Sequence, residues 1–131
     1  MTLRYDPISD LLTRIRNAIR LHQRTVSLPW TRITEQILVL FEREGFIQAS
    51  QKNADNTLHV TLKYDPLTKK PCITNLKRLS KPSLRLYTKS KDIPQVLGGM
   101  GVLLVSTSQG IMTDREAKQK KIGGELLCSI W

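Results

Sequence analysis

The spacing of apolar residues predicts two amphipathic helices in the first third of the chain. After Asp6-Pro7, apolar side chains recur every three or four residues, as one face of a helix requires. An Asp followed by a Pro is typical of an N-cap and the first helical residue. We expect this helix to end near His22, and a second helix to run from about Thr31 to Glu44, where Gly45 stops it. The expected inner faces consist of Ile8, Leu11, Leu12, Ile15 and Ile19 in the first helix and of Ile33, Ile37, Leu40 and Phe41 in the second.

Alternating apolar and polar residues predict strands around these helices. A short strand is expected at Thr25–Leu28, before Pro29. A hairpin is expected from Phe46–Ser50 and Thr57–Tyr64, joined by the turn residues 53–56. The first part of the chain therefore has the predicted order αβαββ.

The pattern changes after the segment Pro66–Pro71, which is the best candidate for a linker. Beyond it we expect one helical turn over Asp92–Leu97, and the capping-box pattern Thr113–Glu116 predicts a short helix that ends near Lys121. Strands are expected at Cys72–Leu79, Leu84–Thr88, Val102–Ser106 and Glu125–Trp131. The chain is therefore predicted to have an α+β fold in two lobes: an N-terminal αβαββ lobe (residues 1–70) and a C-terminal, mainly β lobe with a short helix (residues 71–131).

Charge adds a functional constraint, because the 131 residues include 21 Lys and Arg but only 11 Asp and Glu, a net charge of +10. Hydrophobic residues make up 40 %, which is enough for a packed core and excludes a disordered basic tail. The stretch from Lys69 to Lys91 carries eight basic residues and no acid, interleaved with apolar residues, so we expect these charges on strands. Like charges at this density repel unless a polyanion lies nearby. Charge alone favours nucleic acid, with an anionic membrane surface or an acidic protein as alternatives.

Several other classes of function find no support in the sequence. The longest uncharged stretch, Ile93–Thr113, is interrupted by Pro94 and glycines, which excludes a membrane-spanning helix. No apolar segment typical of a secretory signal is present at the N-terminus, and acids in the first predicted helix argue against a transit peptide. Cys72 and Cys128 do not have the spacing of metal ligands, and two cysteines are too few for a disulfide scaffold in a chain of this length. Both are therefore expected to be reduced thiols in a core.

The sequence also contains no recognisable catalytic or nucleotide-binding motif. Gly98–Gly101 precedes a strand instead of opening a helix, which indicates a backbone turn and not a nucleotide cradle. His22 and His59 have no partner at a ligand spacing. We therefore predict no catalytic residue, no metal and no cofactor. An RNA-modifying or hydrolytic enzyme and a membrane-surface adaptor remain as alternative hypotheses.

The segment Ser106–Gly110 is the most distinctive polar group, with three hydroxyls, an amide and a glycine directly after an apolar strand. It is either an ordinary polar turn or a compact set of donors and acceptors suited to base edges, ribose 2′-hydroxyls and phosphates. Tyr87, close in sequence to Lys89 and Lys91, either stacks on an exposed base or packs within a sheet.

These motifs resemble a known family. Residues 106–115 and 123–128 are similar to the signature of the ribosomal protein S8 family of the small ribosomal subunit. The likeness extends to Asp6–Ile8, Leu12–Asn17 and Glu44–Ile47, and to Leu79–Pro82 with Leu84, Arg85 and Tyr87. The resemblance implies a two-lobed, non-enzymatic structural protein that binds small-subunit rRNA directly and organises its central domain during assembly. Neighbouring small-subunit proteins are the other implied partners, with no membrane and no small-molecule substrate.

The resemblance also implies roles for individual residues. Ser106, Thr107 and Ser108, with Gly110, are expected to touch the RNA, Glu125 to position that loop or accept from a base, and Tyr87 to stack. Phosphate contacts are implied for Lys81, Arg85, Lys89 and Lys91 in the C-terminal lobe and for Arg14 and Arg16, beside Asn17, in the N-terminal lobe. Residues 98–101, 112–116 and Trp131 look most like plastid members, which implies an organelle-encoded protein of the chloroplast stroma, with the bacterial cytoplasm as the alternative.

Overall fold

The computed structural model describes residues 6–131, and its first element is helix α1 (Pro7–Arg20), at the predicted place. The Asp6 carboxylate accepts hydrogen bonds from the backbone N–H groups of Ile8 (3.1 Å) and Ser9 (3.3 Å), which confirms the predicted N-cap. The buried side of the helix consists of Ile8, Leu11, Leu12, Ile15 and Ala18.

Helix α2 (Arg32–Arg43) begins after the N-cap Thr31, whose hydroxyl accepts from the backbone N–H of Thr34. It ends at Gly45, whose φ of +84° is the left-handed conformation that glycine adopts most easily. The predicted inner face needs one correction. Ile33 is only half-buried, because the helix turns its neighbours Thr34 and Leu38 toward the core.

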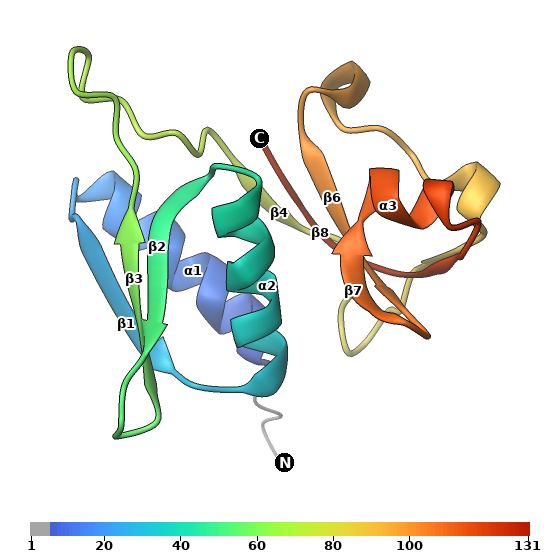
Figure 1. Ribbon diagram of the computed structural model, residues 1–131, viewed down its shortest axis with the longest axis horizontal. Helices are drawn as coiled ribbons and strands as arrows, with labels where there is room; N and C mark the ends of the chain where they lie inside the picture. The colour runs from blue at the N-terminus through green and yellow to red at the C-terminus, as the bar shows by residue number, and fades with distance from the viewer. Residues whose placement is uncertain (1–5) are drawn as a thin grey trace. The chain divides into compact units, whose positions relative to one another are not determined.

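Three antiparallel strands complete the first unit: β1 (Thr25–Pro29), β2 (Ile47–Lys52) and β3 (Thr57–Leu62). Their order is β1-β3-β2, so β3 is central, and α1 and α2 lie on one side of this sheet (Figure 1). Apolar residues of paired strands face each other, as in Val26 with Val60. The predicted αβαββ order is confirmed.

Residues 65–70 form a tight loop at the end of this first unit. The backbone of Asp65 bonds that of Lys70, and the Asp65 carboxylate accepts from the N–H groups of Leu67 (2.8 Å) and Thr68 (3.4 Å). These N–H groups hold the pKa of Asp65 below its usual value. The chain divides into two compact units between Ile73 and Thr74.

The second unit contains a five-stranded antiparallel sheet with the order β4-β8-β6-β7, in which β5 also pairs with β8. Its strands are β4 (Leu76–Arg78), β5 (Tyr87–Thr88), β6 (Val102–Thr107), β7 (Gly110–Thr113) and β8 (Gly124–Ile130). The short helix α3 (Asp114–Gln119) starts with the predicted capping box between Thr113 and Glu116. It packs on one face of the sheet, where the core consists of Ile93, Leu103, Val105, Met112 and Ala117.

Several sequence-based expectations for this unit were wrong. Strand β7 was missed, because it follows a two-residue turn and its few residues carry no clear alternation. The helical turn expected over Asp92–Leu97 is replaced by two 3-10 turns, η1 (Ser90–Asp92) and η2 (Leu97–Gly99), on either side of Pro94.

The basic stretch and the cysteines also differ from expectation. Strands β4 and β5 are so short that most of the basic residues between 69 and 91 lie in turns and loops instead of on strands. Cys128 is buried as expected, but Cys72 is exposed, since the strand predicted to include it begins only at Leu76. Within residues 6–131, none of the helices has the length and apolar character needed to cross a membrane.

Candidate nucleic-acid interface

Three of the predicted site residues lie side by side across the second sheet. Glu125 on β8 is the register partner of Tyr87 on β5 and, on its other side, of Ser106 on β6. Directly opposed residues of antiparallel strands project from the same face. Tyr87, Glu125 and Ser106 therefore form one row, which we call the Tyr87 row.

The Tyr87 row lies on the face opposite to the α3 core. Val105, next to Ser106, is fully buried among Met112 and Ala117 on the α3 side, and successive residues of a strand point to opposite faces. Tyr87 remains 70 % exposed. Of the two interpretations of this tyrosine, the exposure of its own side chain fits stacking better than packing within the sheet.

The Glu125 carboxylate is engaged within the protein. It accepts a hydrogen bond from the Ser80 hydroxyl (2.8 Å) and pairs with Nη1 of Arg85 (2.9 Å). The Glu125 side chain is only 12 % exposed, whereas that of Arg85 is 52 % exposed. These contacts hold Glu125 to Ser80 and Arg85, and they keep a cation beside the one carboxylate of the row. The expected role of Glu125 in positioning the Ser106–Gly110 loop stays a prediction.

Ser80 lies in the Leu79–Pro82 motif, although no role was predicted for it. Its hydroxyl connects Glu125 of β8 to the backbone at Leu86. Ser80 is fully buried, and its hydroxyl accepts from the backbone N–H of Leu86 (3.2 Å). Leu126 of β8 bonds the backbone of both Ser80 and Leu86 (2.9 Å each). Residues 81–85 therefore leave strand β8 and return to it as a closed loop, which we call the 81–85 loop. It carries Lys81 and Arg85, both exposed.

The turn between β6 and β7 presents the other predicted residues. The Thr107 hydroxyl donates to the Gly110 carbonyl (2.8 Å) and accepts from the Gln109 N–H (3.1 Å), so this hydroxyl stabilises the turn. Gly110 has a φ of +109°, which strongly favours glycine. In the part of the chain that the structure describes, the hydroxyls of Ser106 and Ser108 have no hydrogen-bond partner, and Ser108 is exposed.

A glycine brings the two sides of the row together. A Cβ atom at Gly124 would collide with the backbone carbonyl oxygen of Ser106. Strand β8 can therefore approach β6 only because residue 124 has no side chain, and this approach places Glu125 opposite Ser106. This glycine belongs to the motif at residues 123–128, but its steric role could not be predicted because it depends on strand β6.

Basic residues lie next to the row. Tyr87, Thr88, Lys89 and Asp92 line a hollow of about 400 Å³, and Lys91 is exposed on the adjacent turn η1. The structure thus brings Ser106, Glu125, Tyr87 and Arg85 into one neighbourhood of the second unit, with Lys89 at its border.

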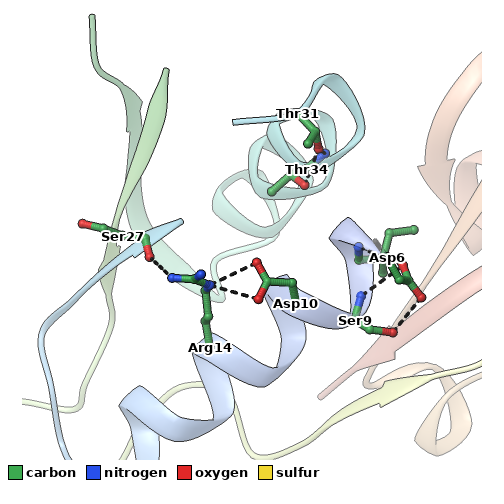
Figure 2. A network of polar contacts seen from close by, with 8 residues as sticks. Asp6, Ser9, Asp10, Arg14, Ser27, Thr31 and Thr34 are labelled. Carbon is green, nitrogen blue, oxygen red and sulfur yellow. Dashed lines mark hydrogen bonds and ion pairs between the residues drawn. The ribbon is translucent and has the colours of Figure 1, made fainter. Parts of the chain in front are cut away.

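The remaining predicted residues belong to helix α1 of the first unit. Arg14 pairs with Asp10 through Nε (3.0 Å), and its Nη1 donates to the carbonyl oxygen of Ser27 on β1 (3.0 Å; Figure 2). Arg14 therefore links the helix to the strand, while 45 % of its side chain stays exposed. Arg16 and Asn17 are exposed on the same helix.

A small basic α+β chain of two units, with serine hydroxyls and an aromatic ring at one end of a sheet and cations in the adjoining loops, is of the kind found among RNA-binding proteins. The family model described as Ribosomal protein S8 matches residues 6–131, and the chain belongs to this family. It is accordingly a structural component of the small ribosomal subunit with a role in translation, and not an enzyme.

Relatives with similar sequences cover almost the whole chain. "Small ribosomal subunit protein uS8c" of Oltmannsiellopsis viridis is 55 % identical over 126 residues, which are 96 % of this chain and 98 % of the relative. The protein of the same name from Tupiella akineta is 56 % identical over 129 residues, 97 % of this chain and 98 % of the relative. "Small ribosomal subunit protein uS8" of the cyanobacterium Gloeothece citriformis is 50 % identical over 129 residues, covering 96 % and 97 %. The uS8c relatives confirm the predicted chloroplast localisation.

Proposed function

We propose that the chain binds small-subunit rRNA directly, through the Tyr87 row and its surroundings, and organises the central domain of that RNA during assembly. The observation that carries this proposal is the row itself, in which Tyr87, Glu125 and Ser106 share one face of the sheet and Tyr87 is exposed. The other implied partners are neighbouring small-subunit proteins. Membership of the S8 family supports the proposal, and the assignment to the central domain rests on that membership.

The surface divides into groups that suit different parts of an RNA. The free hydroxyls of Ser106 and Ser108 can both donate and accept, so they suit base edges and ribose 2′-hydroxyls. The exposed ring of Tyr87 can stack on a base that has left its helix. We assign RNA discrimination to these three residues, because phosphate contacts carry no sequence information of their own.

We assign phosphate contacts, which position the RNA, to exposed cations of each unit. In the second unit these are Lys81, Arg85, Lys89 and Lys91; in the first unit they are Arg14 and Arg16 of α1, beside the polar Asn17. Because Arg85 also pairs with Glu125, its guanidinium is held in one place, where it can present its remaining N–H groups to a phosphate. Thr107 and Gly110 contribute through the shape of the turn that carries Ser108.

The test is a binding titration of the full chain with a central-domain rRNA fragment between 50 and 200 mM salt. Six to ten phosphate contacts would lower the affinity by about 10³–10⁵ over this range, because bound counterions are released. An unrelated RNA of the same length serves as the control and should bind more weakly at every salt concentration. Equal affinity for both RNAs, or binding that does not respond to salt, would contradict the proposal.

A further inference from the structure

Helix α3 ends with a lysine in a left-handed backbone conformation. The backbone N–H of Lys121 donates to the carbonyl of Lys118 (3.1 Å), and that of Ile122 donates to the carbonyl of Ala117 (3.0 Å). This pair of bonds closes a helix with a left-handed residue at the position of Lys121, where glycine is most common. Lys121 has a φ of +56°, a conformation that costs a residue with a Cβ atom more than it costs glycine.

The same closure occurs at the ends of the other two helices, which allows a comparison. Helix α2 has Gly45 at the equivalent position. Helix α1 has His22, with a φ of +54°, and the ring of His22 lies against that of Tyr64 with centroids 6.2 Å apart. The side chain of His22 thus has a partner in the protein. In the described part of the chain, the ammonium group of Lys121 has no hydrogen bond or ion pair, and the residue is exposed.

The end of α3 lies beside the candidate interface. A Cβ atom at Gly123, two residues after Lys121, would lie 2.9 Å from Cα of Lys89. Helix α3 also packs against η1, which carries Lys91, and η1 is visible as the yellow turn near the end of α3 in Figure 1. Two neighbouring segments of the second unit therefore carry five lysines and one acid of η1, Asp92. The lysines are Lys89, Lys91, Lys118, Lys120 and Lys121.

We infer that the RNA-binding surface continues from the Tyr87 row onto the end of α3, where Lys121 binds an RNA phosphate. The inference rests on the proposed function. Lys121 has a strained backbone and no side-chain partner among residues 6–131, and its segment lies next to η1, which carries Lys91. A phosphate supplies a partner for its ammonium group and compensates the excess of positive charge in these two segments.

The test uses Lys121→Gly, because the two effects of this change have opposite signs. Removing the Cβ relieves the strain of the left-handed backbone, which stabilises the folded chain. Glycine also increases the conformational entropy of the unfolded chain, but this destabilising effect is smaller, so the Tm should rise by about 2–6 °C. Loss of the ammonium group should weaken binding of the central-domain rRNA fragment several-fold and reduce the slope of log K against log salt by about one. Lys121→Arg keeps the charge and should bind as the unchanged protein does.

Lys69→Gly is the matched control, since Lys69 is another exposed lysine with a left-handed φ (+59°), in the loop of the first unit. It should raise the Tm without changing the salt slope. Equal RNA binding by Lys121→Gly and the unchanged protein would overturn the inference. So would an equal loss in both glycine variants, because net charge would then explain it, or a lower Tm for Lys121→Gly. Failure of the unchanged protein to prefer its rRNA fragment would instead overturn the proposed function.

Discussion

Ser106 and Glu125 face each other across strands β6 and β8, and this places a hydroxyl that has no partner among residues 6–131 beside a carboxylate that binds Ser80 and Arg85. A carboxylate on an RNA-binding face would repel phosphates if its charge were uncompensated. Arg85 neutralises it at 2.9 Å, and Ser80 binds it from the buried side. Glu125 thus acts as an anchor for the 81–85 loop, and Ser106 is left free for a ligand.

The double variant Ser106→Ala, Ser108→Ala should lose discrimination between RNAs while keeping its fold. Each hydroxyl hydrogen bond contributes about 0.5–1.5 kcal/mol, so the pair should lower the affinity for the central-domain fragment by roughly 5- to 150-fold. Binding to an unrelated RNA of equal length should change little, because the cations are untouched. Competition between the two RNAs at constant salt measures the difference.

The control for this pair is Ser50→Ala, which removes a serine hydroxyl that also lacks a hydrogen-bond partner in the described residues but lies on β2 of the first unit. It should leave both affinities unchanged. If the double variant selected its rRNA fragment as well as the unchanged protein does, the assignment of discrimination to these hydroxyls would be wrong.

Ser80→Ala should destabilise the second unit, because Ser80 is fully buried and water cannot replace its hydroxyl. The change removes the hydrogen bond from the N–H of the partly buried Leu86 and one of the two hydrogen bonds that Oε2 of Glu125 accepts, at a cost of about 1–3 kcal/mol in the free energy of unfolding. Urea denaturation followed by circular dichroism measures this loss. Ser83→Ala, on the exposed 81–85 loop, should stay within about 0.5 kcal/mol; equal effects of the two variants would contradict the role given to Ser80.

The helices and the longer strands could be predicted because their signals are local. The capping residues Asp6 and Thr113 occupy the expected positions, since a cap depends on a few adjacent residues. Strand β5 and the 3-10 turns could not be placed so well. Tyr87–Thr88 is a strand only because β8 offers backbone partners from a segment almost 40 residues later, and no local pattern encodes that pairing.

In the candidate site, too, local features could be predicted and long-range contacts could not. The Ser106–Gly110 turn and the basic stretch are contiguous in the sequence, and they could be singled out on their residue types. In the sequence, Ser80 cannot be distinguished from any other serine. Its role depends on Glu125, which is 45 positions away. Arg14 likewise had a visible charge, but its bond to the carbonyl of Ser27 depends on how the helix lies against the sheet.

Gly124→Ala should perturb the fold and the interface together. The added methyl group would meet the carbonyl oxygen of Ser106, so β6 and β8 must move apart, and overpacking of this kind costs about 1–3 kcal/mol. The separation should also weaken selective RNA binding, because the register contact between Ser106 and Glu125 is disturbed. Thermal unfolding and RNA competition measure the two effects.

Gly45→Ala separates this steric effect from backbone strain, because a Cβ there meets no atom within 4 Å but must adopt a φ of +84°. It should reduce stability by about 1–2 kcal/mol and leave RNA selectivity intact. A Gly124→Ala variant that is as stable and as selective as the unchanged protein would show that the strands tolerate a side chain at this position.

Arg14 combines a structural contact with a proposed phosphate contact, and two substitutions separate them. Arg14→Lys keeps the charge but cannot bond Asp10 and the Ser27 carbonyl in the same geometry, because lysine lacks the planar fork of donors. It should lower the free energy of unfolding by about 0.2–1 kcal/mol, the usual range for an exposed ion pair, with the salt slope of RNA binding unchanged. Arg14→Gln should lose similar stability and also reduce that slope by about one, since it removes the charge. Denaturation curves and salt titrations of both variants provide the comparison. If Arg14→Gln kept the full salt slope, Arg14 would be a purely structural residue that joins α1 to the edge of β1.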